Sequence, residues 1–500
     1  MMLSLLNTVA MFLAGTYTVR GISARLTVSA LDLSGGIREN WLPRMSVLLI
    51  LITCTICGIT ISICRRRLFQ GLKNLSHADR RTHQHIYRSL TAQALLPLAC
   101  ISASTLWLLD ITGIVQSRTL QSAVYTVRIG VQLLLLCLFA PITSEYRELG
   151  APGWSCDADL MKRSKTVPTN VHSLRPADID IVASIGDSLT AGNGAGAEKG
   201  DALAIAIQYR GLTWSVGGDK SLDEHISVAN ILKKFNPNVF GYSIRTGSAN
   251  VWETAHLNAG VPGAHSGDVK GQAEDLVRRM KEHPEIDYLN HWKLVHIFVG
   301  ANDICSWCYR GVDEDGDHYR ENIRKGVKYM QENMPRTIVV LSKMVDMSLL
   351  RRIDRAHEFC NRVHEFECNC EGNKTVTDET LSGICHSYMD KMREMQESGE
   401  FDTTDDFTLI IEPYLSMAED IGRNPDGTPN MDFWAPDCFH FRAYGHAIVA
   451  KNLWKNMMQP VGGQSAANLT DDGEPPLCPD ESCPFIRTTK NSDDCKPYIQ

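Results

Sequence analysis

The sequence predicts an α/β fold with a central parallel sheet that is covered by helices on both faces. Short apolar runs alternate with longer amphipathic segments over residues 178–457, which is the pattern of strands joined by helical crossovers. Hydrophobic residues make up 44% of the 500 residues and charged residues 22%, so a disordered chain and a fibrous repeat are excluded. A hydrophobic N-terminal region precedes this fold and predicts one to three helices of its own.

Four apolar runs predict the buried strands. Each is short and rich in apolar residues, as expected in a parallel sheet with both faces covered. The runs are 178–185, 293–299, 337–341 and 408–412. A further strand is expected directly before Asn258.

The segments between these runs predict helices. In 268–283 the apolar residues recur at helical spacing and fall near one face. Comparable patterns occupy four further segments: 319–331, 350–363, 379–396 and 441–457.

The first 144 residues differ in charge from the rest. They contain 13 Lys/Arg and four Asp/Glu, a net charge of +9, and because the whole chain carries −8 the remainder carries −17. A basic apolar front joined to an acidic polar body predicts membrane attachment followed by a soluble domain. The negative overall charge argues against a nucleic-acid partner, since such proteins usually present a basic surface.

Three apolar segments of this front are candidate membrane spans. Residues 45–64 carry no charge over the length of a bilayer span, and three arginines follow at once. Residues 94–115 are interrupted by a proline and an aspartate, and residues 129–143 are shorter. The last segment also has the anatomy of a signal peptide, with Arg128 before it and small residues after it.

These features predict three parts. Residues 1–144 form the hydrophobic basic region, residues 145–460 form the folded body, and residues 461–500 form an irregular tail rich in Gly, Pro and Asp. The body is expected outside the cell or in a lumen, either anchored to a membrane by the front or secreted if the front is cleaved. A multipass membrane protein whose function lies in residues 1–144 is the alternative.

The cysteines of the body favour an oxidising compartment. Their density in a hydrophilic domain predicts disulfides. Eleven is an odd number, so at least one is unpaired, and Cys438 is the first candidate because it lies inside a motif described below. The eleven are Cys156, Cys305, Cys308, Cys360, Cys368, Cys370, Cys385, Cys438, Cys478, Cys483 and Cys495.

Two further patterns concern modification and metals. Asn373 and Asn468 each begin an N-x-T sequon and are glycosylation candidates, which fits a lumenal fate. The cysteine pairs at 305/308 and 368/370 could supply four thiolates to zinc. A zinc ribbon, however, uses two C-x-x-C pairs at closer range, so no metal is expected.

Polar residues follow the predicted strands, where an open parallel sheet places its active site. Ser188, in Gly186–Leu189, is either a nucleophile beside a helix N-terminus or a helix-capping serine. Asn258–Gly263 supplies glycines that allow a ligand to approach the backbone closely, or that form a tight turn. Asn302, in Gly300–Asp303, can donate its amide to an oxyanion, or the block can form a turn or cap the next helix.

Asp437 and His440 stand three residues apart before the last predicted helix. An Asp carboxylate at this spacing can accept from the imidazole Nδ1–H and orient the ring, so that Nε2 can take a serine proton. Asp432 and His446 lie nearby in the sequence and are competing candidates.

Together and in this order, the four blocks resemble the GDSL (SGNH) hydrolases. The resemblance implies a three-layer α/β/α sandwich with Ser188 as nucleophile, His440 as general base and acid, and Asp437 as the residue that orients His440. It also implies an oxyanion hole formed by the N–H groups of Ser188 and Gly263 and the side chain of Asn302. No cofactor is implied.

Further motifs resemble the phospholipase B branch of this family in particular. This more specific similarity extends from about residue 165 to residue 495. These motifs are 171–178, 187–196, 209–218, 230–238, 437–441 and 478–484.

The resemblance implies a serine esterase that cleaves acyl chains from phospholipids and lysophospholipids through an acyl-enzyme on Ser188. A lipid substrate and a membrane are the implied partners, and the sequence defines no oligomeric state. Two alternatives remain open: an SGNH esterase for carbohydrate or aryl esters, and a catalytically silent membrane-anchored binding protein.

Overall fold

The computed structural model describes residues 147–499 apart from 199–200, 311–314 and 472. The candidate membrane segments at 45–64, 94–115 and 129–143 therefore lie outside the described residues. Nowhere in the described part of the chain is there a helix both long enough and apolar enough to cross a membrane.

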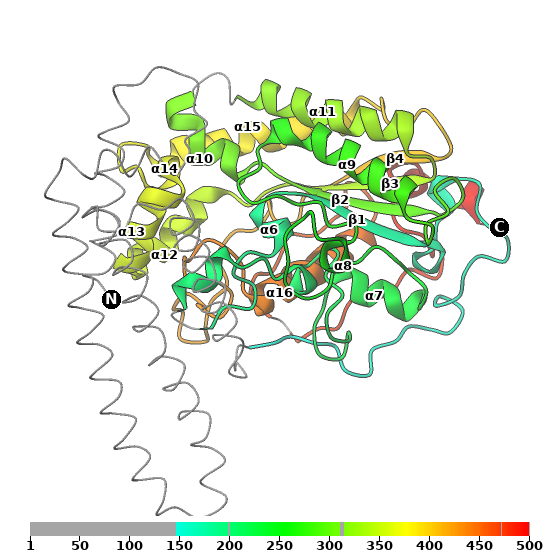
Figure 1. Cartoon of the computed structure of the whole chain (residues 1–500), viewed down its shortest axis with the longest axis horizontal. Coiled ribbons are helices and arrows are strands. Elements are labelled where there is room, and N and C mark those ends of the chain that lie inside the picture. The colour runs from blue at the N-terminus through cyan, green and yellow to red at the C-terminus, as the bar shows by residue number, and fades with distance from the viewer. Residues whose placement is uncertain (1–146, 199–200, 311–314, 472, 500) are drawn as a thin grey trace, which may run out of the picture. The chain divides into compact units, whose positions relative to one another are not determined.

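A four-stranded parallel sheet lies at the centre of the folded unit (Figure 1). Its strands stand in sequence order, and the first residues of β2, β3 and β4 pair level with one another. Every strand residue is buried, as expected where helices cover both faces. The strands are β1 (Ile181–Gly186), β2 (Lys293–Phe298), β3 (Thr337–Ser342) and β4 (Phe407–Glu412). The four predicted strands are confirmed.

The fifth strand, expected before Asn258, is wrong, because the described chain makes only single bridges beside β1. Ile181 bridges Phe240 and Ser184 bridges Asn258, both in parallel orientation. Between these points the chain leaves the sheet edge at Gly241, whose φ is +99°, and forms the short helix α8. The edge of the sheet is thus covered by an interrupted segment rather than by a ladder.

Helices cover both faces of the sheet and complete three layers (Figure 1). Helices α9, α11 and α15 lie over one face, and α6, α7, α8 and α16 lie over the other. The predicted three-layer α/β/α sandwich is therefore confirmed. The helices are α6 (Ser188–Ala191), α7 (Val228–Phe235), α8 (Trp252–Ala255), α9 (Val269–Glu282), α10 (Ala301–Arg310), α11 (Gly316–Asn333), α12 (Arg351–Ala356), α13 (Glu358–Glu367), α14 (Asn369–Gly372), α15 (Asp378–Glu397), α16 (Ala443–Met457) and α17 (Thr489–Asp493).

Helices α10, α12, α13 and α14 gather at the end of the sheet where the strands terminate (Figure 1). We call α12–α14, residues 351–372, the cap. The single helix predicted over 350–363 is two helices, because His357 adopts an extended conformation with φ −137° and ψ 101°. This break lets α13 begin a new direction across the end of the sheet.

Three disulfides attach the cap to its neighbours. Cys305–Cys368 and Cys308–Cys370 join it to α10, and Cys360–Cys438 joins α13 to the loop before α16. Two further disulfides hold the C-terminal segment: Cys156–Cys478 and Cys483–Cys495. The four cysteines considered for zinc are thus all paired with one another and offer no thiolates.

Cys385, and not Cys438, is the free cysteine among the eleven in the described body. The expectation for Cys438 is wrong because its loop faces α13, where Cys360 is within bonding distance. Cys385 lies on the inner side of α15 and is fully buried. Burial raises the pKa of its thiol to about 12, so the reactive thiolate is disfavoured.

We expect alkylation of the native, non-reduced full chain to leave Cys385 unmodified, because its thiol is buried and protonated. After unfolding without reductant, Cys385 should become the modified cysteine of the body. Peptide mass mapping should recover the five disulfide-linked pairs. Label on Cys438 in the native protein would contradict the pairing.

Candidate active site

Ser188 is the first residue of α6, directly after β1. Asp187 is the N-cap, since its Oδ1 accepts from the backbone N–H of Leu189 at 2.9 Å. The capping function is therefore performed by Asp187, and the Ser188 hydroxyl is left for another partner. Burial raises the pKa of Asp187 to about 7.

Gly186 directs the chain into this turn. Its φ is +152°, and a Cβ there would lie 2.1 Å from the carbonyl oxygen of Phe298 on β2. Gln272 of α9 holds the glycine from outside the sheet: its Oε1 accepts from the Gly186 N–H at 2.7 Å, and its Nε2 donates to the Gly186 carbonyl at 2.9 Å. The position of Ser188 thus depends on a residue without a side chain at the end of β1.

One carboxylate organises the loop that carries Asp437 and His440. Asp437 Oδ1 accepts from the backbone N–H groups of Phe439 and His440, both at 3.0 Å. Asp437 Oδ2 lies 2.6 Å from His440 Nδ1. Between them Cys438 adopts a φ of +65°, a conformation that costs a non-glycine residue energy and that its disulfide helps to hold.

His440 connects this loop to Ser188. Its Nε2 lies 2.7 Å from Ser188 Oγ. Because an ionised carboxylate only accepts, Nδ1 carries the proton and donates to Asp437, and Nε2 can accept the Ser188 hydroxyl proton. The structure therefore brings Ser188, His440 and Asp437 together. Asp432 and His446 stay outside: His446 lies in α16 with its ring stacked on Trp214.

The charges of this group stabilise one another. Burial lowers the pKa of His440, but the charge and hydrogen bond of Asp437 outweigh burial and raise that pKa above its usual 6.5. Burial raises the pKa of Asp437, but the charge of His440 and the hydrogen bonds from His440 and Phe439 together outweigh burial, and the net shift is downward. Ser188, Asp437 and His440 are only 9%, 2% and 6% exposed, so little water screens these interactions.

Glu367, the last residue of α13, is a further charged group at His440 that the sequence analysis missed. Its Oε1 lies 3.5 Å from His440 Nδ1, and its side chain is 26% exposed. Burial raises the pKa of Glu367 to about 7, the charge of Asp437 adds to the effect, and His440 opposes it. No local motif marks Glu367, because its approach depends on how the cap folds over the 437–440 loop.

Gly263 lies in a loop and Asn302 in the first turn of α10, and the two segments are bonded to each other. Asn302 Nδ2 donates to the carbonyl of Ala264 at 2.9 Å. The carboxylate of Asp303 accepts from the N–H of Ser266 at 3.0 Å and from its hydroxyl at 2.5 Å. The first turn of α10 is thereby clamped to the loop that carries Gly263.

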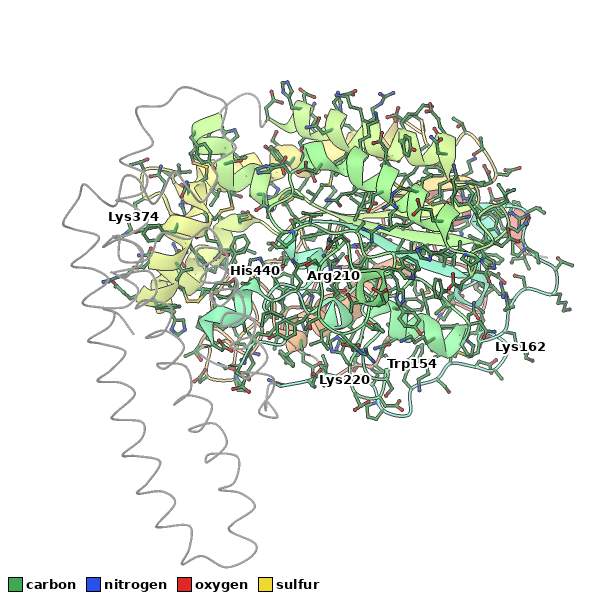
Figure 2. The ribbon with its side chains drawn as sticks, in the orientation of Figure 1. Trp154, Lys162, Arg210, Lys220, Lys374 and His440 are labelled. Carbon is green, nitrogen blue, oxygen red and sulfur yellow. A yellow bond between two sulfur atoms is a disulfide. The ribbon has the colours of Figure 1, made fainter. Side chains whose placement is uncertain are left out.

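The same loop is bonded to the Ser188 turn. Asn258 Nδ2 donates to the carbonyl of Thr190 at 2.9 Å, and the Val261 N–H donates to the carbonyl of Gly186 at 3.0 Å. Arg210, which is fully buried and is labelled in Figure 2, donates to Asn258 Oδ1 at 2.9 Å. The structure thus links Gly263 and Asn302 to Ser188 through buried intermediates.

A cavity of about 740 Å³ adjoins this loop. Gly263 and Ala264 form one wall, and Trp252, Gln272 and Arg279 contribute to the others. Ser188 and His440 do not line the cavity, so it lies on the Gly263 side of the site rather than over the hydroxyl.

The two glycosylation candidates lie at the surface. Asn468 is exposed, and Asn373 is half-buried directly after α14. Each carboxamide oxygen accepts from the N–H of the threonine two residues further on, at 3.0 Å and 2.9 Å respectively. Their modification stays a prediction.

Comparison with protein families agrees with this geometry. The model described as GDSL-like Lipase/Acylhydrolase matches residues 182–453, which is more than half of the chain. The chain therefore belongs to the GDSL-like lipase/acylhydrolase family. A second model, described as Serpentine type 7TM GPCR chemoreceptor Srd, matches residues 27–146, which lie outside the described residues.

Comparison with individual proteins identifies more specific relatives. The chain is 38% identical to mouse membrane-associated phospholipase B1 over 334 residues, which are 66% of this chain and 22% of the mouse protein. The human protein of the same name is 37% identical over 335 residues, 66% of this chain and 23% of its own length. The match thus spans about a quarter or less of these longer relatives. No solved structure matches the chain significantly.

We expect Asp303→Ala to destabilise the protein, because the buried N–H and hydroxyl of Ser266 lose their acceptor. A buried polar group left without a partner costs about 1–3 kcal/mol. Asp268→Ala is the matched control in the same loop: its carboxylate accepts from the exposed N–H of His265. Thermal unfolding of the full chain should show a larger loss for Asp303→Ala than for Asp268→Ala, which removes only an exposed capping bond before α9. Equal melting temperatures would contradict the role of Asp303.

Proposed function

We propose that the chain is a serine esterase that hydrolyses acyl esters of phospholipids and lysophospholipids. The observation that carries the proposal is the chain of hydrogen bonds from Ser188 through His440 to Asp437, at 2.7 Å and 2.6 Å. Such a chain activates a hydroxyl for attack on an acyl carbon. The similarity to membrane-associated phospholipase B1 supports a phospholipid ester as the substrate.

The proposed reaction is a two-step acyl transfer. Ser188 Oγ attacks the ester carbonyl while His440 Nε2 takes the hydroxyl proton, and Asp437 stabilises the imidazolium. His440 then gives the proton to the departing alcohol, which leaves an acyl-enzyme on Ser188. A water molecule repeats the sequence with His440 as base and releases the fatty acid.

The negative oxygen of the tetrahedral intermediate needs hydrogen-bond donors. In this proposal they are the N–H groups of Ser188 and Gly263 and the amide of Asn302. Two observations support the set: Asn302 is bonded to the residue after Gly263, and the Gly263 loop is bonded to the Ser188 turn. One such donor typically contributes about 3 kcal/mol to transition-state stabilisation.

We also propose that residues 145–460 act as the esterase, with 461–500 as its tail, in an oxidising compartment. The five disulfides support an extracellular or lumenal location, and the two N-x-T sequons agree with it. In this proposal residues 1–144 attach the esterase to a membrane, or are removed to release it.

The experiment that tests the proposal uses Ser188→Ala in the full chain. We expect this change to lower kcat for lysophospholipid hydrolysis by on the order of 10⁵- to 10⁶-fold. The reason is that the acyl-enzyme cannot form without the Ser188 hydroxyl as nucleophile. A fluorophosphonate probe should add its mass to Ser188 in the native chain. Ser416→Ala, which removes a hydroxyl that donates to the carbonyl of Pro413 and has no contact with Ser188 or His440 among the described bonds, should keep both activity and labelling.

The outcomes separate the competing functions. Absence of labelling in correctly folded protein would favour a silent binding protein. Labelling with turnover of aryl or carbohydrate esters, but without release of fatty acid from phosphatidylcholine vesicles, would favour a different esterase. Hydrolysis that survives Ser188→Ala would exclude the assigned nucleophile.

A second prediction concerns the pH dependence. His440 must be neutral to take the proton, and because its pKa is raised, kcat/KM should fall as pH decreases from above 6.5. Glu367→Gln removes a negative charge near the imidazolium, which lowers the pKa of His440. The acid limb should therefore move to lower pH.

Glu365→Gln, on the exposed face of the same helix, is the control and should leave the acid limb in place. A purely structural role of Glu367 would lower kcat at every pH without moving the limb. An unchanged profile in Glu367→Gln would show that its carboxylate does not influence His440.

A further inference from the structure

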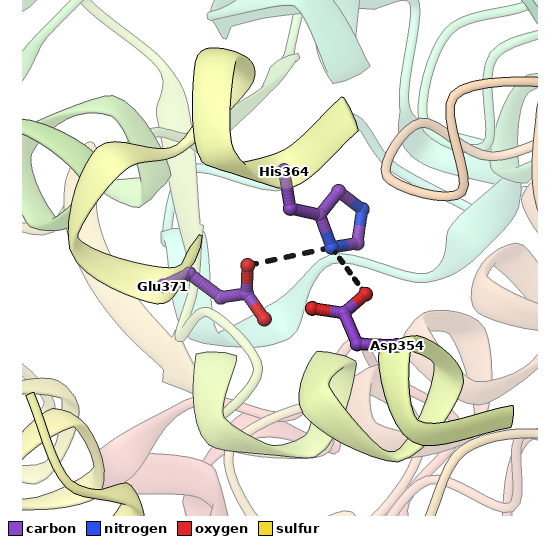
Figure 3. A group of neighbouring side chains, drawn as sticks. All are labelled: Asp354, His364 and Glu371. Carbon is purple, nitrogen blue, oxygen red and sulfur yellow. Dashed lines mark ion pairs between the residues drawn. The ribbon is translucent and has the colours of Figure 1, made fainter. Parts of the chain in front are cut away.

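A second cluster of ionisable side chains lies inside the cap, where the mechanism makes no use of it. Asp354, His364 and Glu371 come from α12, α13 and α14, one from each helix, and their side chains point toward one another (Figure 3). The side chains of His364 and Glu371 are 0% exposed, and that of Asp354 is 8% exposed. Two carboxylates and an imidazole are therefore removed from water together.

The contacts within this cluster are short but poorly directed for hydrogen bonds. His364 Nδ1 lies 2.8 Å from Asp354 Oδ1 and 3.3 Å from Glu371 Oε2. Nevertheless Nδ1, Asp354 Oδ1 and both oxygens of Glu371 are buried without a hydrogen-bond partner of acceptable geometry. Asp354 Oδ1 and Glu371 Oε2 therefore lie close to the ring nitrogen without forming a well-directed hydrogen bond with it.

The group at Ser188 shows the contrast. Glu367, Asp437 and His440 also bring three ligand atoms together. There, however, both nitrogens of His440 make directed hydrogen bonds, to Asp437 at 2.6 Å and to Ser188 at 2.7 Å. That histidine has no vacant direction to offer an ion.

Charge balance also favours a cation inside the cap. Two buried carboxylates outweigh the charge of even a protonated imidazole, and the negative charge that remains is costly unless it is compensated. The guanidinium of Arg351, which lies beside Glu371, is used elsewhere: it donates to the carbonyl of Glu371 at 2.6 Å, to that of Val376 at 2.7 Å and to Asp378 at 2.9 Å. No bond of Arg351 reaches the carboxylate of Asp354 or of Glu371 among the described contacts.

We propose that Asp354, His364 and Glu371 bind a Zn²⁺ ion. One imidazole nitrogen and two carboxylate oxygens are common ligands of zinc, and the charge of +2 cancels that of the carboxylates. Tetrahedral zinc with bonds of about 2.0–2.1 Å separates its ligand atoms by about 3.3 Å. The distance to Glu371 already has this value, and the distance to Asp354 must open by about half an ångström. Asp354, the most exposed of the three, marks the side from which the ion and a water ligand enter.

The zinc would brace the cap beside the catalytic loop. It joins the three short helices of the cap, and it lies next to the disulfides of Cys368 and Cys370. The ring of His364 stands edge-on to Phe439 with centroids 6.0 Å apart, and Phe439 precedes His440. The ion therefore has a structural role, and it is independent of the hydrolytic chemistry proposed for Ser188.

The test measures the metal content of the full chain after dialysis against micromolar zinc and then against metal-free buffer. We expect about one zinc per chain in the native sequence and in Ser188→Ala, and almost none in His364→Gln and Glu371→Gln. His446→Gln removes an equally buried histidine outside the cluster and should keep the zinc. His440→Gln should keep it as well, which distinguishes the cap from the group at Ser188.

The visible absorption of Co²⁺ bound to the native chain tests the site without any variant. If the His364 and Glu371 variants fail to fold, Co²⁺ in the native chain should still show the visible absorption of a tetrahedral site, without the thiolate charge-transfer band that cysteine ligands would produce. A folded native chain that retains neither zinc nor cobalt would overturn the proposal. Zinc that survives in folded His364→Gln, or that is lost in His440→Gln, would overturn it too.

Discussion

The two oxygens of the Asp437 carboxylate set the geometry on which the rest of the site depends. One oxygen accepts from two backbone N–H groups and so forms the turn, and the other accepts from His440 Nδ1. Because both oxygens belong to one rigid group, the turn that Oδ1 stabilises also places Oδ2 where it can hold the ring. The three-residue spacing between Asp437 and His440 is therefore the spacing that a tight turn requires, whatever the chemical role of the two residues.

A few contacts at the end of β1 place Ser188 beside the ring of His440. Gly186 ends β1 so close to β2 that no side chain fits, and Gln272 holds its peptide groups from α9. Asn258 then connects α6 to the loop of Gly263. These contacts join segments that are far apart in the sequence, and Gly186 and Gln272 alone are separated by 86 residues, so the positions of Ser188 and His440 are determined by the packing of the whole sandwich.

The sequence predicted the features that depend on local pattern. The four strands and the long helices followed from apolar periodicity, and Ser188, Asp437 and His440 followed from turns at strand ends together with the family resemblance. The sequence did not predict features that depend on how distant segments fold together. These are the break at His357, the pairing of Cys438 with Cys360, and the approach of Glu367 to His440. Cysteine counting correctly required an unpaired thiol, but only the inward side of α15 identifies it as Cys385.

The interrupted segment beside β1 has a consequence for solubility. A regular fifth strand would have exposed its own outer row of N–H and C=O groups, which can recruit strands from other molecules and begin aggregation. Phe240 and Leu257 instead satisfy β1 at separate points, and the chain between them bulges away with α8. This margin of the sheet therefore offers no continuous template to a neighbouring molecule, while the chain beyond Asn258 is free to curve toward Ser188.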